Sequence, residues 1–390
     1  MAEPEQLLHA SLGIDRLKAF RSFAEIAVAS IGCALIAAAA AANQAWFDRH
    51  FLPSYWTPHQ EIVRTELFVR IGVAVAGAVI VLLAQKMARL LTREPLYPFT
   101  ISLAVILAFG ASELVLRRWR PGPHEFSRES EPRSHLDARL GWSFDISRTG
   151  SATHLGRHVA YTFDRNGYRV ASAADTTDFD APTIVFTGES IMVGHRLAWA
   201  ETIAAQTSAM LGLQGANIAV SGFGTDQAYL RLTAELPRFR HPVAVVSLFA
   251  PSIFDRNLDD DRPHLGPGLV WLPPVRQWRL TALAKRLLGY RSEEDVERGS
   301  AVTREVLTAT VRLARARGAI PLIVVPQFEP EEQQERELRR RIIEQAHLPY
   351  VYVPLDPDDR VENDGHPDAD GARTIAEAIA DALRPALASR

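Results

Sequence analysis

The sequence has little cysteine, the residue that crosslinks chains and holds soft metal ions. It contains one, Cys33, which lies inside an apolar run. A single cysteine excludes an intrachain disulfide and any metal site built from several cysteines. This count is compatible with an oxidising or a reducing compartment.

Lysine is also scarce, and no cluster of basic residues is interleaved with aromatic ones. Only Lys18, Lys86 and Lys285 are lysines among the 43 basic residues, and the formal net charge is -3. A nucleic-acid-binding surface needs concentrated positive charge to meet the phosphate backbone. We therefore expect no nucleic acid among the partners.

Apolar residues are abundant, and the long apolar runs lie in the first third of the chain. Hydrophobic residues make up 47% of the 390 positions. Three runs, at about 23–42, 67–84 and 96–115, are long enough to cross a bilayer as helices. They lack the polar face that buried helices of a soluble bundle usually keep, which is the alternative interpretation. We predict a membrane anchor over residues 1–120, with the lipid bilayer as a partner.

The first apolar run has a competing interpretation as a cleavable signal peptide. The long basic region before it and the two later runs favour an uncleaved span. Basic residues precede the first span and follow the second, and these two segments share one side of the membrane. Because basic residues favour the cytoplasmic side, we expect a cytoplasmic N-terminus and a C-terminal domain on the opposite side.

The rest of the chain has the texture of a globular α/β domain. Residues 121–181 predict a linker and a small β appendage, because Asn166-Gly167 between short β-rich runs is typical of a hairpin. Residues 182–390 alternate five apolar strands with helices, which predicts a three-layer α/β/α sandwich with a parallel sheet. An insertion at 251–298, rich in Asp, Pro and Gly, is interpreted as a lid or edge loop. Strands are expected near 183–187, 216–220, 242–249, 320–325 and 350–353, and helices near 199–213, 226–236, 300–317, 330–347 and 370–389.

The first of these strands ends in Gly188, Glu189 and Ser190, after which a helix begins. In a parallel sheet such a turn lies at the carboxyl edge, where the next helix presents unpaired N–H groups and the positive end of its dipole. A serine at this position faces a crevice in a field that favours developing negative charge. The alternative interpretation is that Ser190 is a helix cap.

Other strand ends carry the remaining parts of a serine-based site. A nucleophilic serine needs a base, an acid that orients the base, and N–H donors for the oxyanion. His366 and Asp364 can supply the base and the acid for Ser190, and the N–H groups of Ser190 and Gly222 can supply the donors. Taken alone, a histidine in a loop before a proline is more often a surface or capping residue. The occurrence of all these groups at successive strand ends favours the catalytic interpretation.

These residues resemble the SGNH or GDSL hydrolase family. Residues 188–190 are similar to its first block, with Glu189 where the family usually has aspartate. Residues 217–227 are similar to the second block and residues 364–371 to the last, and the resemblance extends from about Leu140 to the C-terminus. It implies a flavodoxin-like strand order of 2-1-3-4-5 and esters of carboxylic acids as substrates. We expect no cofactor.

The sequence departs from the family pattern at two positions. The family's third block supplies an oxyanion-hole asparagine, and here Ser252 stands at the expected place, with Asn257 five residues later. Losing one oxyanion donor typically costs about 100- to 1000-fold in turnover. The family's acid most often lies three residues before the histidine, a position held by Asn363, with Asp364 one place nearer. We assign Ser252 as the third oxyanion donor, and Glu189, Asn363 and Asn257 as supporting residues.

A calcium-binding loop is the alternative interpretation of the last block. His366, Asp368, Asp370, Gly371 and Glu377 fit the spacing of an EF-hand loop except at the first position, where histidine replaces aspartate. The preceding segment forms loop instead of helix. We therefore expect no metal ion.

Together these features predict a membrane-anchored SGNH-type serine esterase. The resemblance implies O-acyl or O-acetyl groups of cell-envelope polysaccharides as substrates, in a bacterial inner membrane with the hydrolase domain outside the cytoplasm. One alternative is a catalytically impaired protein of the same fold that binds carbohydrate or acts as a scaffold. Another is an O-acyltransferase, although three spans are too few to form the acyl-donor channel known from the larger fused transferases.

Overall fold

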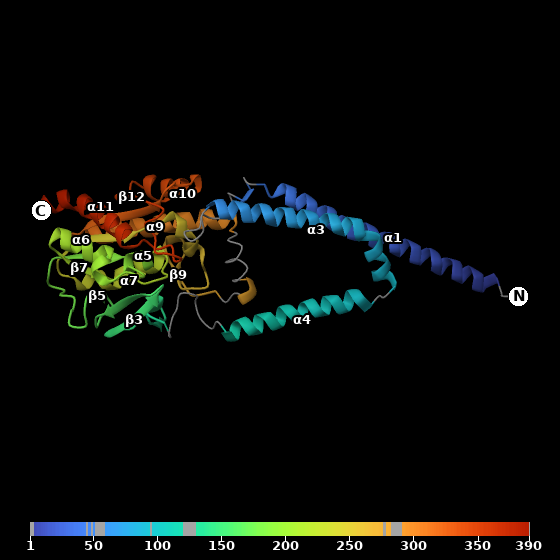
Figure 1. Ribbon diagram of the computed structural model, residues 1–390, viewed down its shortest axis with the longest axis horizontal. Coiled ribbons are helices and arrows are strands. Elements are labelled where there is room, and N and C mark those ends of the chain that lie inside the picture. Colours follow the sequence, from blue (N-terminus) through green and yellow to red (C-terminus); the bar gives the residue numbers. More distant parts are fainter. Residues whose placement is uncertain are drawn as a thin grey trace. The chain divides into compact units, whose positions relative to one another are not determined.

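The structure is a computed structural model that describes residues 4–43, 46–47, 50, 59–93, 96–119, 130–275, 278–281 and 291–389. The chain divides into two compact units (Figure 1). One unit contains the N-terminal helices together with residues 278–281, and the other contains the sheet and its covering helices.

The N-terminal unit contains three long helices, α1 (Pro4–Ala41), α3 (His59–Arg93) and α4 (Leu96–Trp119). Their stretches Ala19–Ala41, Val63–Thr92 and Phe99–Arg118 are long and apolar enough to cross a membrane. The prediction of three apolar helices is confirmed. The second stretch is longer than the expected 67–84 because the helix continues without a break through the charged residues at both ends.

Helices α1 and α3 pack against each other through small residues. A Cβ atom on Gly32 would lie 2.6 Å from the carbonyl oxygen of Gly77, and one on Gly77 would lie 2.7 Å from that of Gly32. These glycines allow the two backbones to approach closely, as small residues do between membrane helices. Near one end of this contact, Nε of Arg70 donates a hydrogen bond to the carbonyl of Ala39 at 3.1 Å.

Helix α4 is tied to a segment of the predicted insertion 251–298. The Glu113 carboxylate accepts hydrogen bonds from the backbone N–H groups of Arg279 at 3.0 Å and Leu280 at 2.9 Å. Arg117, one turn later on α4, donates to the same carboxylate at 2.6 Å. The insertion therefore returns to the helical unit instead of forming only an edge loop.

The second unit is built on one eight-stranded sheet in the order β12-β11-β8-β6-β7-β5-β4-β3. Strands β7, β6, β8, β11 and β12 pair in parallel. In chain order these five strands are 2-1-3-4-5, which confirms the predicted flavodoxin-like order. The strands are β3 (Arg148–His154), β4 (Arg157–Phe163), β5 (Arg169–Val170), β6 (Thr183–Thr187), β7 (Gln214–Asn217), β8 (Pro242–Leu248), β11 (Ile320–Phe328) and β12 (Tyr350–Leu355).

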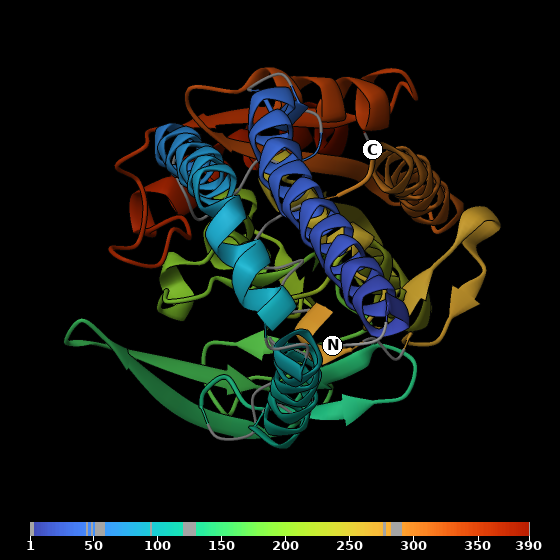
Figure 2. The ribbon, with the colours of Figure 1, turned by 90° about the vertical axis from the view of Figure 1, so that its right-hand side faces the viewer.

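The sheet is wider than the predicted five strands. Strand β5 pairs antiparallel with β7 through Arg169 and Asn217, and β4 and β3 continue the sheet outward (Figure 2). Part of the expected appendage thus extends the main sheet, because β7 would otherwise be an edge with unpaired backbone groups. Two hairpins stand outside this sheet: β1 (Ser134–Asp137) with β2 (Gly141–Phe144), and β9 (His264–Leu265) with β10 (Trp271–Leu272).

Helices cover both faces of the parallel strands, so the predicted three-layer sandwich is confirmed. Along β6, Ile184 and Phe186 belong to one core cluster with Ile375 of α11 (Ala369–Ala388). Val185 points to the other face and joins a cluster with Leu232 of α7 (Thr225–Glu235). Burial on both faces explains why the strands are continuous apolar runs. Helix α6 (Ile203–Leu211) packs on α11, and α9 (Glu293–Ala316) packs on α7.

Several element ends differ from the expected ones. Strand β7 stops at Asn217 instead of continuing to 220, and β11 runs on to Phe328. Helix α9 begins at Glu293 because Ser292 caps it by accepting a hydrogen bond from the Asp295 N–H at 3.1 Å. The expected helix 330–347 is divided into α10 (Gln333–Arg339) and a π-helical turn, Arg340–Glu344.

Candidate active site

Ser190 lies at the carboxyl edge of the sheet, at the first position of the short helix α5 (Ser190–Val193). Strand β6 ends at Thr187, and Gly188 then takes a φ of 154°, which non-glycine residues rarely adopt. A Cβ atom on Gly188 would lie 3.2 Å from Cβ of Met192. Glycine is therefore needed for the turn that presents Ser190.

The structure brings Ser190 together with the predicted base and acid, across 176 residues of sequence. Nε2 of His366 is 2.7 Å from Oγ of Ser190, and Nδ1 of His366 hydrogen-bonds to Oδ1 of Asp364. Ser190 and His366 are each 5% exposed. This chain of contacts has the connectivity that a serine nucleophile, its base and an orienting acid require.

The loop between β12 and α11 explains why Asp364, and not Asn363, contacts the histidine. Asn363 is exposed and takes a left-handed φ of 56°, and Gly365 follows with a φ of 81°. Two left-handed residues make a turn tight enough for Asp364 to reach a histidine only two positions later. Asn363 therefore forms part of the turn, and Asp364 is the residue that hydrogen-bonds to His366.

A second pair of residues holds Asp364 from the other side. Nε of Arg196 donates to Oδ2 of Asp364 at 3.0 Å, and Nε2 of His195 lies 3.9 Å from the same oxygen. Burial alone would raise the pKa of Asp364, but the hydrogen bonds from His366 and Arg196 outweigh it and lower that pKa well below the ordinary value. Asp364 is therefore ionised and oriented at neutral pH.

His195 is a residue of this site that the sequence did not indicate. Its ring lies 4.7 Å from the ring of His366. Burial, reinforced by the neighbouring His366 and opposed by Asp364, lowers the pKa of His195 to about 3. The ring is thus neutral at physiological pH. The sequence did not mark His195 as a site residue, because His195 forms no motif with the other residues of the site.

Arg169 at the start of β5 holds the turn that carries His195 and Arg196. Its guanidinium donates to the carbonyls of Val193 at 2.7 Å, Gly194 at 2.6 Å and Leu197 at 2.5 Å. Burial lowers the pKa of Arg169 to about 10. The antiparallel extension of the sheet therefore braces the active-site turn.

The backbone N–H groups assigned to the oxyanion hole are available for a ligand. Ser190 is the first residue of its helix, a position whose N–H has no intrahelical acceptor. The Gly222 N–H donates to no acceptor in the part of the chain that the structure describes. The loop itself is fixed, because Trp142 donates to the Ser221 carbonyl at 2.9 Å and Arg262 donates to the Gly222 carbonyl at 2.6 Å.

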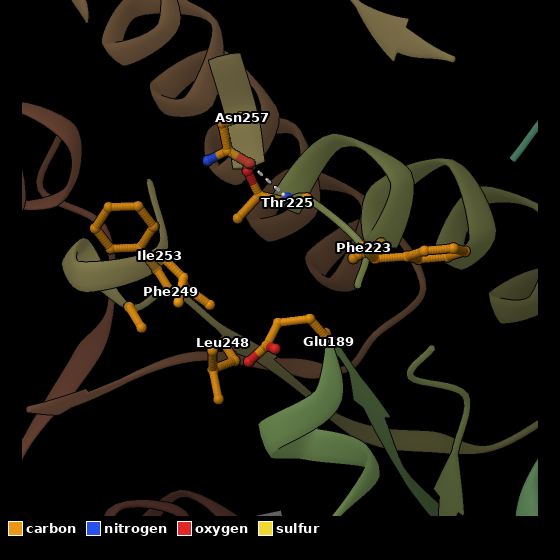
Figure 3. A pocket seen from close by; sticks show the side chains of 11 residues that line it. Glu189, Phe223, Thr225, Leu248, Phe249, Ile253 and Asn257 are labelled. Carbon is orange, nitrogen blue, oxygen red and sulfur yellow. Dashed lines mark hydrogen bonds between the residues drawn. The ribbon is translucent and has the colours of Figure 1, made fainter. Parts of the chain in front are cut away.

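Two residues assigned near the third oxyanion position lie in the 3₁₀ segment Pro251–Leu258. Ser252 is half-buried there. Asn257 is engaged elsewhere, since its Oδ1 accepts from the Thr225 N–H at 2.9 Å (Figure 3) and its Nδ2 donates to Thr303 at 3.1 Å. Asn257 therefore braces the loop after Gly224 and does not point a donor at Ser190.

Glu189 makes the closest side-chain contact to the serine. Its Oε2 lies 2.6 Å from Oγ of Ser190, and Nη1 of Arg256 lies 3.0 Å from the same Oε2. Its Oε1 accepts from the Ile191 N–H at 3.3 Å and so caps α5. Arg256 was not indicated by the sequence, because it lies inside the insertion at 251–298, where no motif marks it.

One group of side chains meets a geometric criterion for a metal site. His195, Asp364 and His366 have possible ligand atoms within 4.8 Å of one another. The facing atoms of Asp364 and His366 are already occupied by Arg196 and Ser190. The aspartate spacing that suggested an EF-hand loop has a different explanation. Asp368 caps α11 by accepting hydrogen bonds from the N–H groups of Asp370 and Gly371.

Comparison with solved structures finds similar folds at low identity. A lipolytic protein of the G-D-S-L family from Desulfitobacterium hafniense is 12% identical, with a TM-score of 0.34, over 52% of this chain and 99% of that one. A carbohydrate acetylesterase family member from Sinorhizobium meliloti is 13% identical, with a TM-score of 0.34, over 53% and 99%. An acetyl xylan esterase from Butyrivibrio proteoclasticus is 13% identical, with a TM-score of 0.33, over 55% and 66%.

The sequence matches no protein-family model and no curated protein. The strand order and the contacts of this chain define its fold and its candidate site. The parallel order 2-1-3-4-5, with a serine after the first strand and an Asp-Gly-His turn before the last helix, gives the globular unit the SGNH/GDSL hydrolase fold. This confirms the fold that the sequence predicted.

Proposed function

We propose that the protein is a membrane-anchored serine esterase of the SGNH type. The observation that carries the proposal is the contact chain from Ser190 through His366 to Asp364 at the carboxyl edge of a parallel sheet. Co-occurrence of these contacts with two available N–H donors suits acyl transfer better than any other chemistry of serine.

In the proposed reaction, Oγ of Ser190 attacks the ester carbonyl while Nε2 of His366 accepts its proton. The N–H groups of Ser190 and Gly222 stabilise the tetrahedral oxyanion, and Ser252 is proposed as a third donor. His366 then gives the proton to the departing alcohol, which leaves an acyl group on Ser190. Water attacks this acyl-enzyme with His366 as base, and His366 then returns the proton to Oγ of Ser190 as the carboxylic acid is released. Asp364 keeps Nδ1 of His366 protonated and fixes the ring.

The proposed substrates are O-acyl or O-acetyl esters on cell-envelope polysaccharides. The support is the pairing of a membrane anchor with an ester-cleaving site, because such a chain keeps its catalytic unit at a membrane surface. We propose that the N-terminus is cytoplasmic and the catalytic unit lies outside the cytoplasm of a bacterial inner membrane, as the distribution of basic residues favours.

The second candidate is a catalytically impaired protein of the same fold that binds carbohydrate or acts as a scaffold. Its support is the Glu189 carboxylate, which lies 2.6 Å from the serine oxygen and competes with His366 for the hydroxyl hydrogen. An O-acyltransferase is a third candidate, in which a glycan hydroxyl replaces the water of the second step.

The test is covalent labelling of the full-length protein in detergent micelles with a small fluorophosphonate, alongside hydrolysis of p-nitrophenyl acetate. We expect both for the wild type and neither for Ser190→Ala. Ser300→Ala is the matched control, because Ser300 is also 5% exposed but lies on α9. A folded wild type with neither labelling nor hydrolysis favours the impaired protein, and acetyl transfer to an added sugar that exceeds hydrolysis favours the transferase.

A further inference from the structure

The hairpin β9–β10 carries an exposed apolar run, residues 270–275, whose sequence is Val-Trp-Leu-Pro-Pro-Val. All six residues are exposed. None of their side chains carries a charge, and the indole of Trp271 holds their one polar atom. Soluble surfaces scatter exposed apolar side chains singly, whereas a contiguous exposed run marks a surface that contacts another molecule or a membrane. The apolar run therefore has the character of a contact surface.

The opposite side of the hairpin is fixed to the globular unit. Leu265 on β9 is 5% exposed and belongs to a core cluster with Leu230 of α7 and Val306 of α9. The backbone N–H of Leu265 donates to Oδ2 of Asp226 at 2.9 Å. Figure 2 shows the hairpin, in gold, at the periphery of this unit. Its packed side therefore holds the apolar run outward.

Trp271 combines a satisfied polar atom with an exposed ring. Its Nε1 donates to the carbonyl of Arg139 at 3.0 Å, and the residue is 40% exposed. Val270 before it is 58% exposed, and Val275 is 50% exposed. Tryptophan is enriched where a membrane meets water, because its ring is amphipathic. The apolar run thus has the composition of a segment that lies at a lipid surface.

Chain length keeps the apolar run close to a membrane helix, whatever arrangement the two units adopt. Arg279 follows Val275 by four residues, which span at most about 14 Å when fully extended. The Arg279 N–H donates to the Glu113 carboxylate on α4 at 3.0 Å. Glu113 lies about 7.5 Å along the helix from Arg118, where the apolar stretch of α4 ends. When α4 spans a bilayer, that end lies at the membrane surface.

The residues at this attachment are also typical of a membrane surface. Trp278 is 61% exposed and directly precedes the helical turn 279–281, whose first N–H groups donate to Glu113. Arg117 and Arg118 end the apolar stretch of α4, and long basic side chains reach from such helix ends to the lipid head groups. Tryptophan thus stands at both ends of the connection, at positions 271 and 278.

We propose that the apolar run is a second membrane contact, through which the hairpin β9–β10 docks on the surface of the bilayer. Val270, Trp271 and Val275 lie among the head groups and the first acyl carbons. The contact is additional to the three apolar helices and does not depend on the proposed esterase activity. Because the run is uncharged, apolar burial drives the contact, and a zwitterionic lipid surface is the partner.

The experiment places a dye on the apolar run of the full-length protein, reconstituted in phosphatidylcholine bilayers. Cys33→Ala removes the one native cysteine, and Val270→Cys or Val275→Cys then carries an environment-sensitive maleimide dye. Lipids with a nitroxide at a shallow or a deep acyl carbon serve as quenchers. We expect both positions to be quenched, and more by the shallow nitroxide, because interfacial contacts reach only about 5–10 Å into the boundary of head groups and acyl chains. Added salt should leave the quenching unchanged.

Leu155→Cys, also in the Cys33→Ala background, is the matched control. Leu155 is apolar and 61% exposed, but it lies between β3 and β4. Its dye should remain unquenched. Val270→Glu, read by the dye of Val275→Cys, should lower the quenching, because a charge is unfavourable among acyl chains. Thermal melting checks that each variant is folded, and the two reporter positions serve as independent tests where one variant does not fold.

Each outcome supports or overturns the contact, and none depends on ester hydrolysis. Two unquenched reporters in a folded protein overturn the proposal. Equal quenching of the dye at Leu155→Cys overturns the assignment to the hairpin, because the unit then meets the bilayer without a defined face. A dye emission that shifts to shorter wavelength without lipid quenching, and reverts when more lipid dilutes the protein, identifies a second copy as the occupant and also overturns the proposal.

Discussion

The hydroxyl oxygen of Ser190 lies 2.6 Å from Oε2 of Glu189, the residue immediately before it. The same oxygen is 2.7 Å from Nε2 of His366. A serine hydroxyl has one hydrogen, so it can donate to only one of these two acceptors at a time. The carboxylate therefore competes with the proposed base, and its negative charge lies beside the proposed nucleophile.

Glu189→Gln should raise the turnover of p-nitrophenyl acetate by about 10-fold, because the amide removes the charge that competes with His366. A hydrogen bond worth about 1.4 kcal/mol corresponds to a factor of ten in rate. The melting temperature should fall, since Arg256 loses its buried partner. Glu377→Gln on the exposed face of α11 is the control and should change neither quantity. A loss of turnover in Glu189→Gln would instead make the carboxylate a participant in the reaction.

The orientation of His366 depends on Asp364 and not on its neighbour. Asp364→Asn should reduce kcat for p-nitrophenyl acetate by roughly 10,000-fold, as in the serine-protease case, because the amide no longer fixes the tautomer of the histidine. Asn363→Ala should retain turnover. Adding Asn363→Asp to Asp364→Asn should restore nothing, because residue 363 is exposed in a left-handed turn. Recovery in that double variant would show that the acid can work from the position usual in the family.

Sequence patterns predicted the parallel core well because burial on both faces leaves a simple signal. The uninterrupted apolar runs of β6, β8 and β11 indicated their strands directly, and the position of Ser190 after β6 follows from the geometry of parallel sheets. The pairing of β5 with β7 left no such signal, since it rests on a single residue pair.

The residues that surround the predicted triad could not be found from sequence. His195, Arg196 and Arg256 reach the site through side-chain directions and loop paths that have no period or motif. Arg169 is the clearest case, because a lone arginine at the start of a two-residue strand is ordinary in sequence. Its importance appears only from the three carbonyls that surround its guanidinium.

The neutral state of His195 makes the stability of the globular unit sensitive to acid. In the unfolded chain its pKa is about 6.5, and in the folded chain its pKa is about 3. Between these values the unfolded state binds more protons, so the free energy of unfolding falls as the pH falls, by at most about 1.4 kcal/mol per pH unit. The contribution of His195 is complete above about pH 6.5 and is lost progressively below it.

His195→Gln should therefore reduce the loss of melting temperature between pH 7 and pH 5, measured on the full-length protein in micelles. This window lies above the range in which Asp364 titrates, because the pKa of Asp364 is lowered and its own contribution is lost only at more acidic pH. His158→Gln is the control, because His158 is exposed on β4 and its ring hydrogen-bonds to the exposed Thr153. Equal pH dependence in the wild type and His195→Gln would contradict the assignment.

Arg169 should be the most sensitive position outside the triad. Arg169→Met keeps much of the side-chain volume but leaves the carbonyls of Val193, Gly194 and Leu197 buried without their donor. Each buried acceptor left unsatisfied costs about 1–3 kcal/mol, so we expect a loss on the order of 3 kcal/mol or more in the free energy of unfolding.

The same change should lower kcat for p-nitrophenyl acetate more than it raises KM, because the turn after α5 carries the Arg196 contact to Asp364. Arg169→Lys should rescue little, since one ammonium group cannot reach three carbonyls in the geometry of a planar guanidinium. Arg240→Met is the matched control, because its ion pair with Asp180 is exposed and such pairs contribute little. A variant of Arg169 that keeps both its melting temperature and its kcat would show that the turn holds itself in place without the arginine.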